Sequence, residues 1–420
     1  MTDRRFPPSL PLRGTLRMPG DKSISHRALI LGSMAAGPSR IRGLADGLDV
    51  ASTRRCITDL GAEATGGPAD VIVKGWSQGP LDRLELDCGN SGTTMRLLAG
   101  VLAWAPGKRV MRGDESLARR PMLRIVDPLR EMGARIESDA GHAPLTIEGG
   151  PLHGIDHTPS APSSQVKSCV LLAGMGAEGA TSVTELSRTR DHTERMLKQM
   201  GARIHETPDR ITIEAGPLSP LDCEVPGDVS SAAFLIVATL LIPGSELRIE
   251  GVGLNETRTG FLRVLARMGA DILIEVETTE PEPVGAIEVR SSRLVATHIA
   301  GRELPGLDEV PILALAGAFA EGATTFIDVG DLRHKESDRV SSTCEMLRTL
   351  GVEVQEHPEG LVVHGGARPA GGAVDPAQDH RIALTAAVAG MASRDGVVVA
   401  DWESASVSYP GFESSIGSVT

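Results

Sequence analysis

The chain has 420 residues, of which 41% are apolar, so it is long enough for two domains with cores of ordinary size. Its formal net charge of −13 and its 2% aromatic content argue against a general nucleic-acid-binding protein, which needs clustered cations and stacking rings. Five widely spaced cysteines without a Cys-x-x-Cys pair indicate free thiols rather than a disulfide framework or a zinc site. We find neither a signal peptide nor an apolar run long enough for a bilayer, and therefore expect a cytoplasmic protein without a membrane partner.

The first predicted helix has a polar and cationic start. Residues 20–27, Gly-Asp-Lys-Ser-Ile-Ser-His-Arg, lead into the apolar run 28–37 and contain several residues that cap helices well. The free N–H groups and the dipole of a helix start attract anions, and Lys22 and Arg27 add full positive charges. Ser23 and Arg27 share a helix face at spacing i, i+4. The segment predicts a phosphate or carboxylate site, and the alternative is a solvated basic helix start.

Similar helix-like runs recur along the chain, which indicates internal repeats. Each run ends at a glycine that is followed by a strand-like stretch, and these glycines are Gly37, Gly107, Gly179, Gly244, Gly322 and Gly396. A second helix ends at Leu60-Gly61-Ala62, Met132-Gly133-Ala134, Met200-Gly201-Ala202, Met268-Gly269-Ala270 and Leu350-Gly351-Val352. The markers recur every 65 to 82 residues. We therefore predict six strand–helix–strand–strand–helix–strand units, with linkers near residues 19 and 226.

Polar segments stand ahead of the predicted helices. Ahead of the first helices they are residues 20–23, 89–94, 162–165, 226–231, 307–310 and 379–381. Ahead of the second helices they are residues 119–121, 188–192, 258 and 335–339. If the helices of each domain point their N-termini one way, these segments converge on a cleft rich in N–H donors, hydroxyls and cations. Such a cleft predicts one or two polyanionic substrates.

Two carboxylates lie inside these cationic motifs. Asp308 and Glu336 precede the two helices of the fifth repeat, and carboxylates among cations are candidates for acid–base chemistry. The alternative for Glu336 is a surface ion pair with Arg339 at spacing i, i+3. Residues 20–23 and 251–253 fail as a P-loop and a dinucleotide fingerprint, so we expect no nucleotide cofactor and no metal. We expect the polar residues Asp228, Ser230 and Ser231 to be plain helix caps.

Together, residues 20–27, 89–93, 335–339 and 379–381 resemble the motifs of the 5-enolpyruvylshikimate-3-phosphate (EPSP) synthase family, the 3-phosphoshikimate 1-carboxyvinyltransferases. The resemblance covers essentially the whole chain. It implies an α/β fold, a two-domain inside-out α/β barrel of six βαββαβ repeats with three per domain. One domain would comprise residues 1–19 plus 227–420, and the other residues 20–226.

The resemblance also implies the reaction. The enolpyruvyl group of phosphoenolpyruvate would pass to the 5-hydroxyl of shikimate 3-phosphate by addition and elimination, with release of phosphate, in the biosynthesis of chorismate and aromatic amino acids. No metal or organic cofactor is implied. The expected partners are the two substrates alone, without nucleic acid, and the expected state is a monomer.

The resemblance assigns roles residue by residue. Lys22 would help to protonate the leaving phosphate, Asp308 would accept the proton of the 5-hydroxyl, and Glu336 would protonate the methylene carbon. With His380, these residues form the expected catalytic set. The expected ligands of shikimate 3-phosphate are Lys22, Ser23, Arg27, Ser163, Ser164, Gln165, Arg190, Asp308, Asp331 and Lys335. The expected ligands of phosphoenolpyruvate are Lys22, Asn90, Gly92, Arg120, Gln165, Arg339, His380 and Arg381.

The sequence departs from the family pattern at several positions. Val407 stands where many members carry lysine, and Asp331 stands where many carry asparagine. Arg190 resembles a subgroup that has arginine in place of tyrosine at the shikimate site. Gly92 adds no methyl group beside the phosphoenolpyruvate site, which predicts ordinary sensitivity to glyphosate.

Two other functions are open at this point. A sister enzyme of the same fold, UDP-N-acetylglucosamine enolpyruvyl transferase, would need a cysteine on a mobile loop of the second repeat. Cys88 instead precedes a helix start, and residues 111–116 contain no cysteine. The second alternative is a metabolite-binding protein that has lost the chemistry, and the presence of Lys22, Asp308 and Glu336 argues against it.

Overall fold

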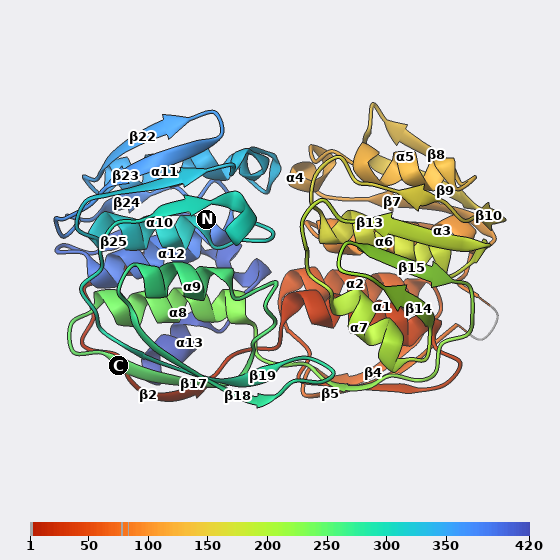
Figure 1. Cartoon of the computed structure of the whole chain (residues 1–420), viewed down its shortest axis with the longest axis horizontal. Coiled ribbons are helices and arrows are strands. Elements are labelled where there is room, and N and C mark those ends of the chain that lie inside the picture. The colour runs from red at the N-terminus through yellow and green to blue at the C-terminus, as the bar shows by residue number, and fades with distance from the viewer. Residues whose placement is uncertain (1–2, 77–78, 83) are drawn as a thin grey trace. The chain divides into compact units, whose positions relative to one another are not determined.

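The computed structural model describes residues 3–76, 79–82 and 84–420, and the chain forms two compact units (Figure 1). The terminal unit consists of Met1–Pro19 and Pro226–Thr420. The inserted unit consists of Gly20–Val225. The chain therefore passes between the units at two points, after Pro19 and after Val225.

The four-stranded sheets of the inserted unit share one pairing pattern. Each starts with a parallel pair of strands and continues with two antiparallel partners. In sheet order the strands are β16 (Asp222–Glu224), β3 (Ser39–Arg42), β5 (Asp70–Lys74) and β4 (Glu63–Gly67); β6 (Leu84–Asp87), β7 (Gly107–Arg112), β9 (His142–Gly149) and β8 (Arg135–Asp139); and β11 (Asp156–His157), β13 (Ala180–Thr184), β15 (Arg210–Glu214) and β14 (Arg203–Glu206). The repeated order follows from the repeated sequence pattern.

The terminal unit uses the same pattern and completes its sheets with strands from the start of the chain. Its sheets contain β2 (Arg13–Arg17), β17 (Glu246–Gly253), β19 (Val284–Arg290) and β18 (Asp271–Thr278); β20 (His298–Ala300), β21 (Ala323–Ile327), β23 (Gly360–His364) and β22 (Glu353–His357); and β24 (Gly372–Val374), β25 (Val397–Val399) and β1 (Arg4–Phe6). Because β1 and β2 pair with β25 and β17, the first residues of the chain belong to this unit.

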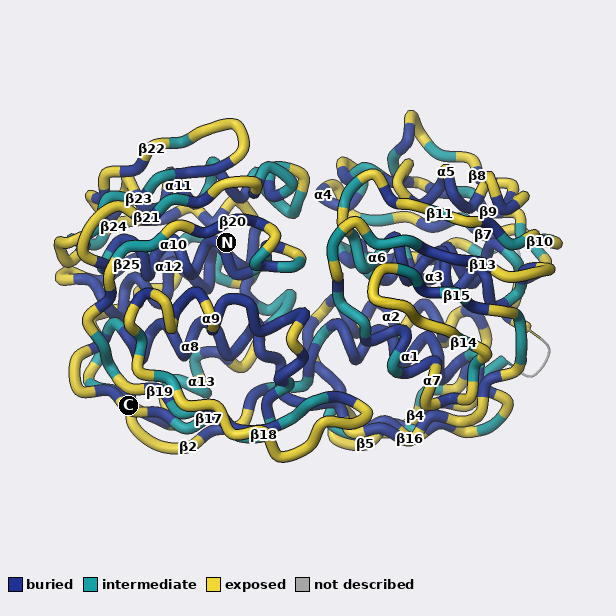
Figure 2. Tube along the Cα trace, in the orientation of Figure 1, coloured by how far each residue is buried: buried dark blue, intermediate teal, exposed yellow. Residues whose placement is uncertain are grey.

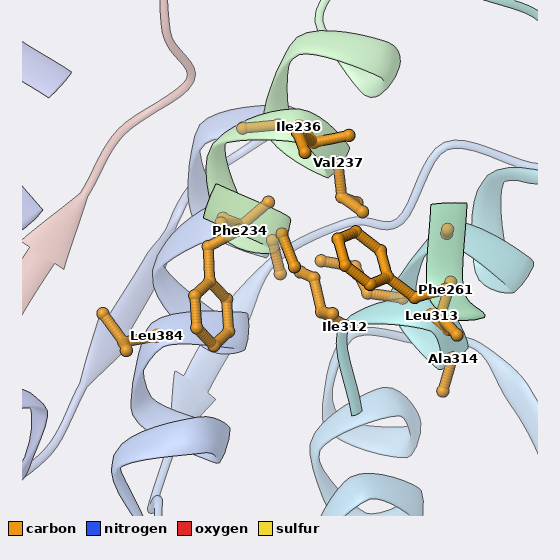
Figure 3. Close-up of a cluster of buried hydrophobic side chains, with 14 of the residues drawn as sticks. Phe234, Ile236, Val237, Phe261, Ile312, Leu313, Ala314 and Leu384 are labelled. Atoms are coloured by element: carbon orange, nitrogen blue, oxygen red, sulfur yellow. The ribbon is translucent and has the colours of Figure 1, made fainter. Parts of the chain in front are cut away.

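The first helix of each repeat lies in the core of its unit. These helices are α1 (Lys22–Met34), α3 (Gly92–Trp104), α6 (Ser164–Gly174), α8 (Val229–Leu241), α10 (Val310–Phe319) and α12 (His380–Ala392). They are buried on nearly all sides, as expected for helices without a solvent-facing surface. Figure 2 shows α8, α10 and α12 as buried, and Figure 3 shows Phe234, Ile312 and Leu384 of these helices in one apolar cluster.

The second helices are amphipathic and end at the predicted signatures. They are α2 (Leu48–Asp59), α5 (Leu123–Glu131), α7 (His192–Gln199), α9 (Gly260–Arg267) and α11 (Arg339–Thr349). In α9, Phe261, Val264 and Leu265 are fully buried and make the apolar face. Gly269 follows α9 with φ of +89°, a left-handed conformation that a side chain would strain. The predicted helix ends and the strands that follow them are therefore confirmed.

Short elements complete the chain. They are α4 (Glu115–Ala118), α13 (Phe412–Gly417), the 3₁₀-helices η1 (Gly301–Glu303), η2 (Gly330–His334) and η3 (Trp402–Val407), and the paired strands β10 (Leu152–His153) and β12 (Ala177–Glu178). After β25, η3 and α13 occupy the place of a sixth second helix. There Phe412 packs edge-on against Phe6 and Trp402, which anchors the C-terminal residues on the N-terminal strand.

Two sequence-based expectations concern cysteines and membranes. All five cysteines are buried and none forms a disulfide, so the prediction of free thiols is confirmed. Among the described residues, no helix is both long enough and apolar enough to cross a bilayer.

Candidate functional site

The three core helices of the inserted unit each begin with a capped N-terminus. Asp21, Ser91 and Ser163 accept a hydrogen bond from the backbone N–H three residues further on, at 2.9, 3.2 and 3.3 Å respectively. The caps fix the direction in which the chain enters each helix. Ser163, a predicted substrate ligand, is therefore also a helix cap, and Ser164 is the first residue of α6.

Lys22 is held by an acidic residue at the start of the neighbouring helix. Its Nζ lies 3.0 Å from Oδ2 of Asp49, in the first turn of α2. Both side chains are largely buried, and the carboxylate is also favoured by the positive end of the α2 dipole. Sequence reasoning did not identify Asp49, because an acidic residue in a first helical turn is common.

Ser23, Arg27 and Arg190 form one group at the start of α1. Arg27 is 3% exposed and donates from Nε to Thr193 Oγ1 at 2.7 Å and from Nη2 to Ser168 Oγ at 3.0 Å. Its Nη1 donates to the carbonyl oxygen of Ser23 at 3.0 Å, as expected for residues at spacing i, i+4. Arg190 donates from Nη1 to the hydroxyl of Ser23 at 3.1 Å. Two guanidinium groups thus lie beside one serine, an arrangement suited to a phosphate group.

A second cationic group lies at the start of α3. Arg120, which is buried, donates from Nη2 to the side-chain oxygen of Asn90 at 2.5 Å. A Cβ atom on Gly92 would lie 2.8 Å from Nη1 of Arg96 and 3.3 Å from Nη1 of Arg120. The absence of a side chain at Gly92 therefore leaves room for both guanidinium groups.

Gln165 belongs to the same group. Its Oε1 accepts from Nη1 of Arg96 at 2.6 Å, and its Nε2 donates to Oγ1 of Thr93 at 3.0 Å. These two bonds tie the start of α6 to the first turn of α3. Arg96 was missed in the sequence, although it lies at spacing i, i+4 from Gly92, the same spacing that drew attention to Arg27.

The terminal unit contains a cluster of acidic residues around one arginine. Arg339, 1% exposed at the start of α11, donates from Nε and Nη2 to the two carboxylate oxygens of Asp379 at 2.7 and 3.2 Å. Its Nη1 lies 3.1 Å from Oδ1 of Asp308, and its Nη2 lies 2.6 Å from Oε2 of Glu336. Burial alone would lower the pKa of Arg339, but the charges of Asp379, Glu336 and Asp308 raise it above the usual value. Arg339 is therefore a permanent cation.

Asp308 also lies close to a second cation, Lys335. Nζ of Lys335 lies 3.6 Å from Oδ1 of Asp308 and donates to the carbonyl of Gly306 at 3.1 Å. The predicted alternative for Glu336 was a surface ion pair with Arg339; the pair is present but is buried, because the Arg339 side chain is 1% exposed. The two carboxylates nevertheless share one guanidinium group, so the pair does not exclude a role in proton transfer.

His380 and Arg381 begin α12 and are both buried. The Arg381 guanidinium lies over the ring of Phe234 at 5.8 Å from the ring centroid. Its Nη2 is 4.0 Å from Oδ2 of Asp308, and its Nη1 is 3.9 Å from Oε1 of Glu309. The structure thus brings Asp308, Glu336, Arg339 and Arg381 together within the terminal unit.

Two further positions complete this description. Asp331 is half-buried in η2, the short helix that precedes Lys335. Val407, at the position where many relatives were expected to carry lysine, is the last residue of η3. Among the residues that the structure describes, no group of three or more His, Cys, Asp or Glu is arranged to hold a metal ion.

The expectation of plain caps at residues 228–231 was only partly right. Asp228 does cap α8, accepting from the N–H of Ser230 at 3.1 Å. Ser230 and Ser231 lie inside the helix instead. The Ser230 hydroxyl donates to Oε1 of Glu309 at 2.5 Å, and Arg258 donates to the same hydroxyl at 2.7 Å. The Ser230 hydroxyl therefore joins α8 to the residue that precedes α10, a contact that no local sequence pattern predicts.

Comparisons with known proteins agree along the whole chain. The family model described as EPSP synthase (3-phosphoshikimate 1-carboxyvinyltransferase) matches residues 7–416. The chain is 46% identical over 425 aligned positions to the 3-phosphoshikimate 1-carboxyvinyltransferase of Desulforudis audaxviator, with 99% of both chains covered. It is 48% identical over 418 positions to a protein of the same name from Thermus thermophilus, with 97% of this chain and 96% of the relative covered. A solved structure of EPSP synthase from Acinetobacter baumannii matches with a TM-score of 0.86 at 36% identity and covers 99% of this chain and 97% of its own.

Proposed function

Because the chain belongs to the EPSP synthase (3-phosphoshikimate 1-carboxyvinyltransferase) family, we propose that it transfers the enolpyruvyl group of phosphoenolpyruvate to the 5-hydroxyl of shikimate 3-phosphate. The observation that carries the proposal is the joint contact of Asp308 and Glu336 with the Arg339 guanidinium. Proton transfer to and from a substrate needs acid–base groups close together, and the shared contact with Arg339 supports this role because it keeps the two carboxylates near one another.

The addition step uses both carboxylates. Asp308 accepts the proton of the 5-hydroxyl as the hydroxyl oxygen forms a bond to C2 of the enolpyruvyl group. Glu336, in its protonated form, gives a proton to C3, which becomes a methyl group, and is left as a carboxylate. The product is a tetrahedral intermediate that still carries the phosphate. Arg339 stabilises the negative charge around these transfers by direct contact with both carboxylates.

The elimination step restores the double bond. The C2–O bond to phosphate breaks, phosphate leaves with a proton from Lys22, and Glu336, which gave up its proton in the addition step, takes a proton from the C3 methyl group. The contact of Lys22 with Asp49 keeps the ammonium group near the start of α1.

The anionic groups of the substrates are assigned to the two cationic groups of the inserted unit. Ser23, Arg27 and Arg190 bind shikimate 3-phosphate, with Ser163, Ser164, Asp331 and Lys335 as further ligands of this substrate. Asn90, Gly92, Arg120 and Gln165 bind phosphoenolpyruvate, together with Arg339, His380 and Arg381. Arginine suits this role because its planar fork can bind two oxygens of one anion.

We also infer that each unit is an inside-out α/β barrel of three βαββαβ repeats and that the two units are the domains of a monomeric, cytoplasmic enzyme. Support comes from the burial of α8, α10 and α12 and from the shared strand order of the sheets. The alternative with a UDP-sugar acceptor is not favoured, because β7 and the residues that lead to α4 contain no cysteine.

One assay tests the proposed reaction. Phosphate release from phosphoenolpyruvate is measured with shikimate 3-phosphate and, separately, with UDP-N-acetylglucosamine. Release with shikimate 3-phosphate alone supports the proposal, and Asp308→Asn and Glu336→Gln should then each abolish most of it. Release only with the UDP-sugar, or with neither acceptor, would refute the proposal.

A further inference from the structure

Lys167 is a buried cation that no part of the proposed reaction uses. It lies on the core helix α6, with a side chain that is 1% exposed. Its Nζ is 2.9 Å from Oε1 of Glu185 and 2.6 Å from Oε1 of Glu194. Burial alone would lower the pKa of Lys167, but the charges of Glu194 and Glu185 raise it, so the side chain stays charged. A buried charge of this kind is retained only with its partners in place.

Glu185 connects this cation to the residues that precede α7. Its Oε1 accepts a hydrogen bond from the backbone N–H of Thr189 at 3.0 Å and another from the Thr189 hydroxyl. Residues 185–191 lie between β13 and α7 and belong to no helix or strand. The contacts of Glu185 with Thr189 therefore hold residues 185–189 in a turn, although this segment belongs to no helix or strand.

Arg190 directly follows the residue that Glu185 holds. From this position its Nη1 donates to the Ser23 hydroxyl at 3.1 Å. The direction of the Arg190 side chain thus depends on the turn, and the turn depends on Glu185 and through it on Lys167.

Glu194, the second carboxylate partner of Lys167, lies next to a residue that contacts Arg27. Glu194 follows Thr193, whose hydroxyl accepts from Nε of Arg27 at 2.7 Å and is 2.7 Å from the Ser168 hydroxyl. Ser168 is the residue next to Lys167 on α6. Lys167 therefore contacts both Glu185 and Glu194. Glu185 holds Thr189, which precedes Arg190, and Glu194 follows Thr193, which accepts a hydrogen bond from Arg27.

We propose that Lys167 and Glu185 are positioning residues for the binding of shikimate 3-phosphate, holding Arg190 against Ser23 before the substrate arrives. The physical reason is preorganisation. An arginine on an irregular segment would lose side-chain and backbone freedom on binding, and a segment already fixed avoids that loss. The inference rests on the proposed function, because it takes shikimate 3-phosphate as the ligand of Ser23 and Arg190.

The test measures binding of shikimate 3-phosphate by isothermal titration calorimetry, without phosphoenolpyruvate and therefore without turnover. Glu185→Ala removes the partner of Thr189 and should raise the Kd at least about tenfold, equivalent to about 1.4 kcal/mol. The KM for phosphoenolpyruvate, measured at saturating shikimate 3-phosphate, should change less than about twofold, since its proposed ligands lie on other segments. A rise of similar size for both substrates would mean general damage to the unit and would overturn the inference.

A double-mutant cycle separates positioning from general stabilisation. Arg190→Ala is made alone and together with Glu185→Ala. If Glu185 acts through Arg190, Glu185→Ala should change the Kd less than about twofold once Arg190 is absent. An unchanged tenfold effect in the Arg190→Ala background would show that Glu185 does not act through Arg190 and would overturn the inference.

Two controls make the result decisive. Glu214 of the same unit forms an exposed ion pair with Arg203, and Glu214→Ala should leave both substrate affinities unchanged. If Glu185→Ala does not fold, Glu185→Gln replaces it, because this variant keeps the shape of the side chain and leaves Lys167 paired with Glu194. Glu185→Gln should then weaken binding of shikimate 3-phosphate when Arg190 is present, but not in the Arg190→Ala variant. Equal effects with and without Arg190 would count against the inference.

The outcomes for the wild type keep the two proposals distinguishable. Binding of shikimate 3-phosphate without release of phosphate from phosphoenolpyruvate would refute the proposed reaction, while the cycle would still decide the role of Glu185. Absence of shikimate 3-phosphate binding to the wild type would overturn both.

Discussion

Arg339 and Asp379 form a two-pronged pair in which Nε and Nη2 donate to the two carboxylate oxygens at 2.7 and 3.2 Å. Because two parallel bonds fix the plane of a guanidinium group, the remaining N–H groups have a set direction. Nη1 donates to Oδ1 of Asp308 at 3.1 Å, and Oε2 of Glu336 lies 2.6 Å from Nη2. Asp379 also caps α12 through the N–H of Arg381, so one carboxylate orients the cations of two helix starts.

The first prediction follows from this pair. Asp379→Asn keeps an N-cap residue but removes the buried negative charge opposite Arg339. We expect turnover to fall at least about tenfold and the free energy of unfolding to fall by about 3 kcal/mol, the usual loss when a buried ion pair is broken. Steady-state kinetics and denaturant unfolding measure the two effects. Arg4 forms an exposed ion pair with Glu413, and Glu413→Gln is the control, with little change expected in either quantity.

The second prediction concerns Gly92. The methyl group of Gly92→Ala would lie 2.8 Å from Nη1 of Arg96 and 3.3 Å from Nη1 of Arg120, so both guanidinium groups must shift. These atoms end flexible side chains, so the variant should fold. We expect the KM for phosphoenolpyruvate and the inhibition constant for glyphosate to rise, the latter by about tenfold or more. An inhibition constant equal to that of the wild type would contradict this account.

The third prediction concerns pH and His26. Burial, with the nearby charges of Lys22 and Arg27, holds the pKa of His26 well below its usual value. Below about pH 6.5, His26 binds a proton in the unfolded chain but stays neutral in the folded chain. The free energy of unfolding should therefore fall as the pH falls, by up to about 1.4 kcal/mol per pH unit. His26→Gln should lose less stability between about pH 6.5 and about pH 5 than the wild type.

Urea unfolding at several pH values measures this difference. The matched control is His357→Gln, because His357 is exposed. Its stability should follow the wild-type dependence on pH. Parallel curves for the wild type and His26→Gln would show that His26 is not the titrating group.

The fourth prediction concerns the thiols. Burial raises the pKa of Cys344 to about 11 and that of Cys223 to about 12, and it also raises the pKa of Cys169. The thiolate is the reactive form, so these side chains should resist iodoacetamide at about pH 8 in the folded protein and react after unfolding. Mass spectrometry of labelled protein counts the modified cysteines. Rapid labelling of the native chain would contradict the burial of these residues.

Much of the local structure could be predicted because it depends on neighbours in the sequence. The apolar run after Arg27 and the glycine-ended signatures predicted α1 and the second helices, since helix periodicity, capping and C-terminal glycines act within a few residues. The same local reasoning placed Ser23 and Arg27 on one face of α1, where they lie.

Contacts between distant residues could not be predicted in this way. Arg27 meets Ser168 and Thr193 across 141 and 166 positions of the chain, and Ser230 was expected to be a cap but contacts Glu309. In the sequence, Lys167 is a single charge inside an apolar helix, and nothing nearby identifies Glu185 or Glu194 as its partners.

The sequence by itself determined the repeated elements and the polar helix starts, because backbone propensity, periodicity and capping are short-range. Only the tertiary structure decided which charges meet, such as Arg339 with Asp379 and Lys167 with Glu185. The physical reason is that a buried charge is stable only beside a specific partner, and that partner is brought into place by the packing of elements that are distant in the sequence.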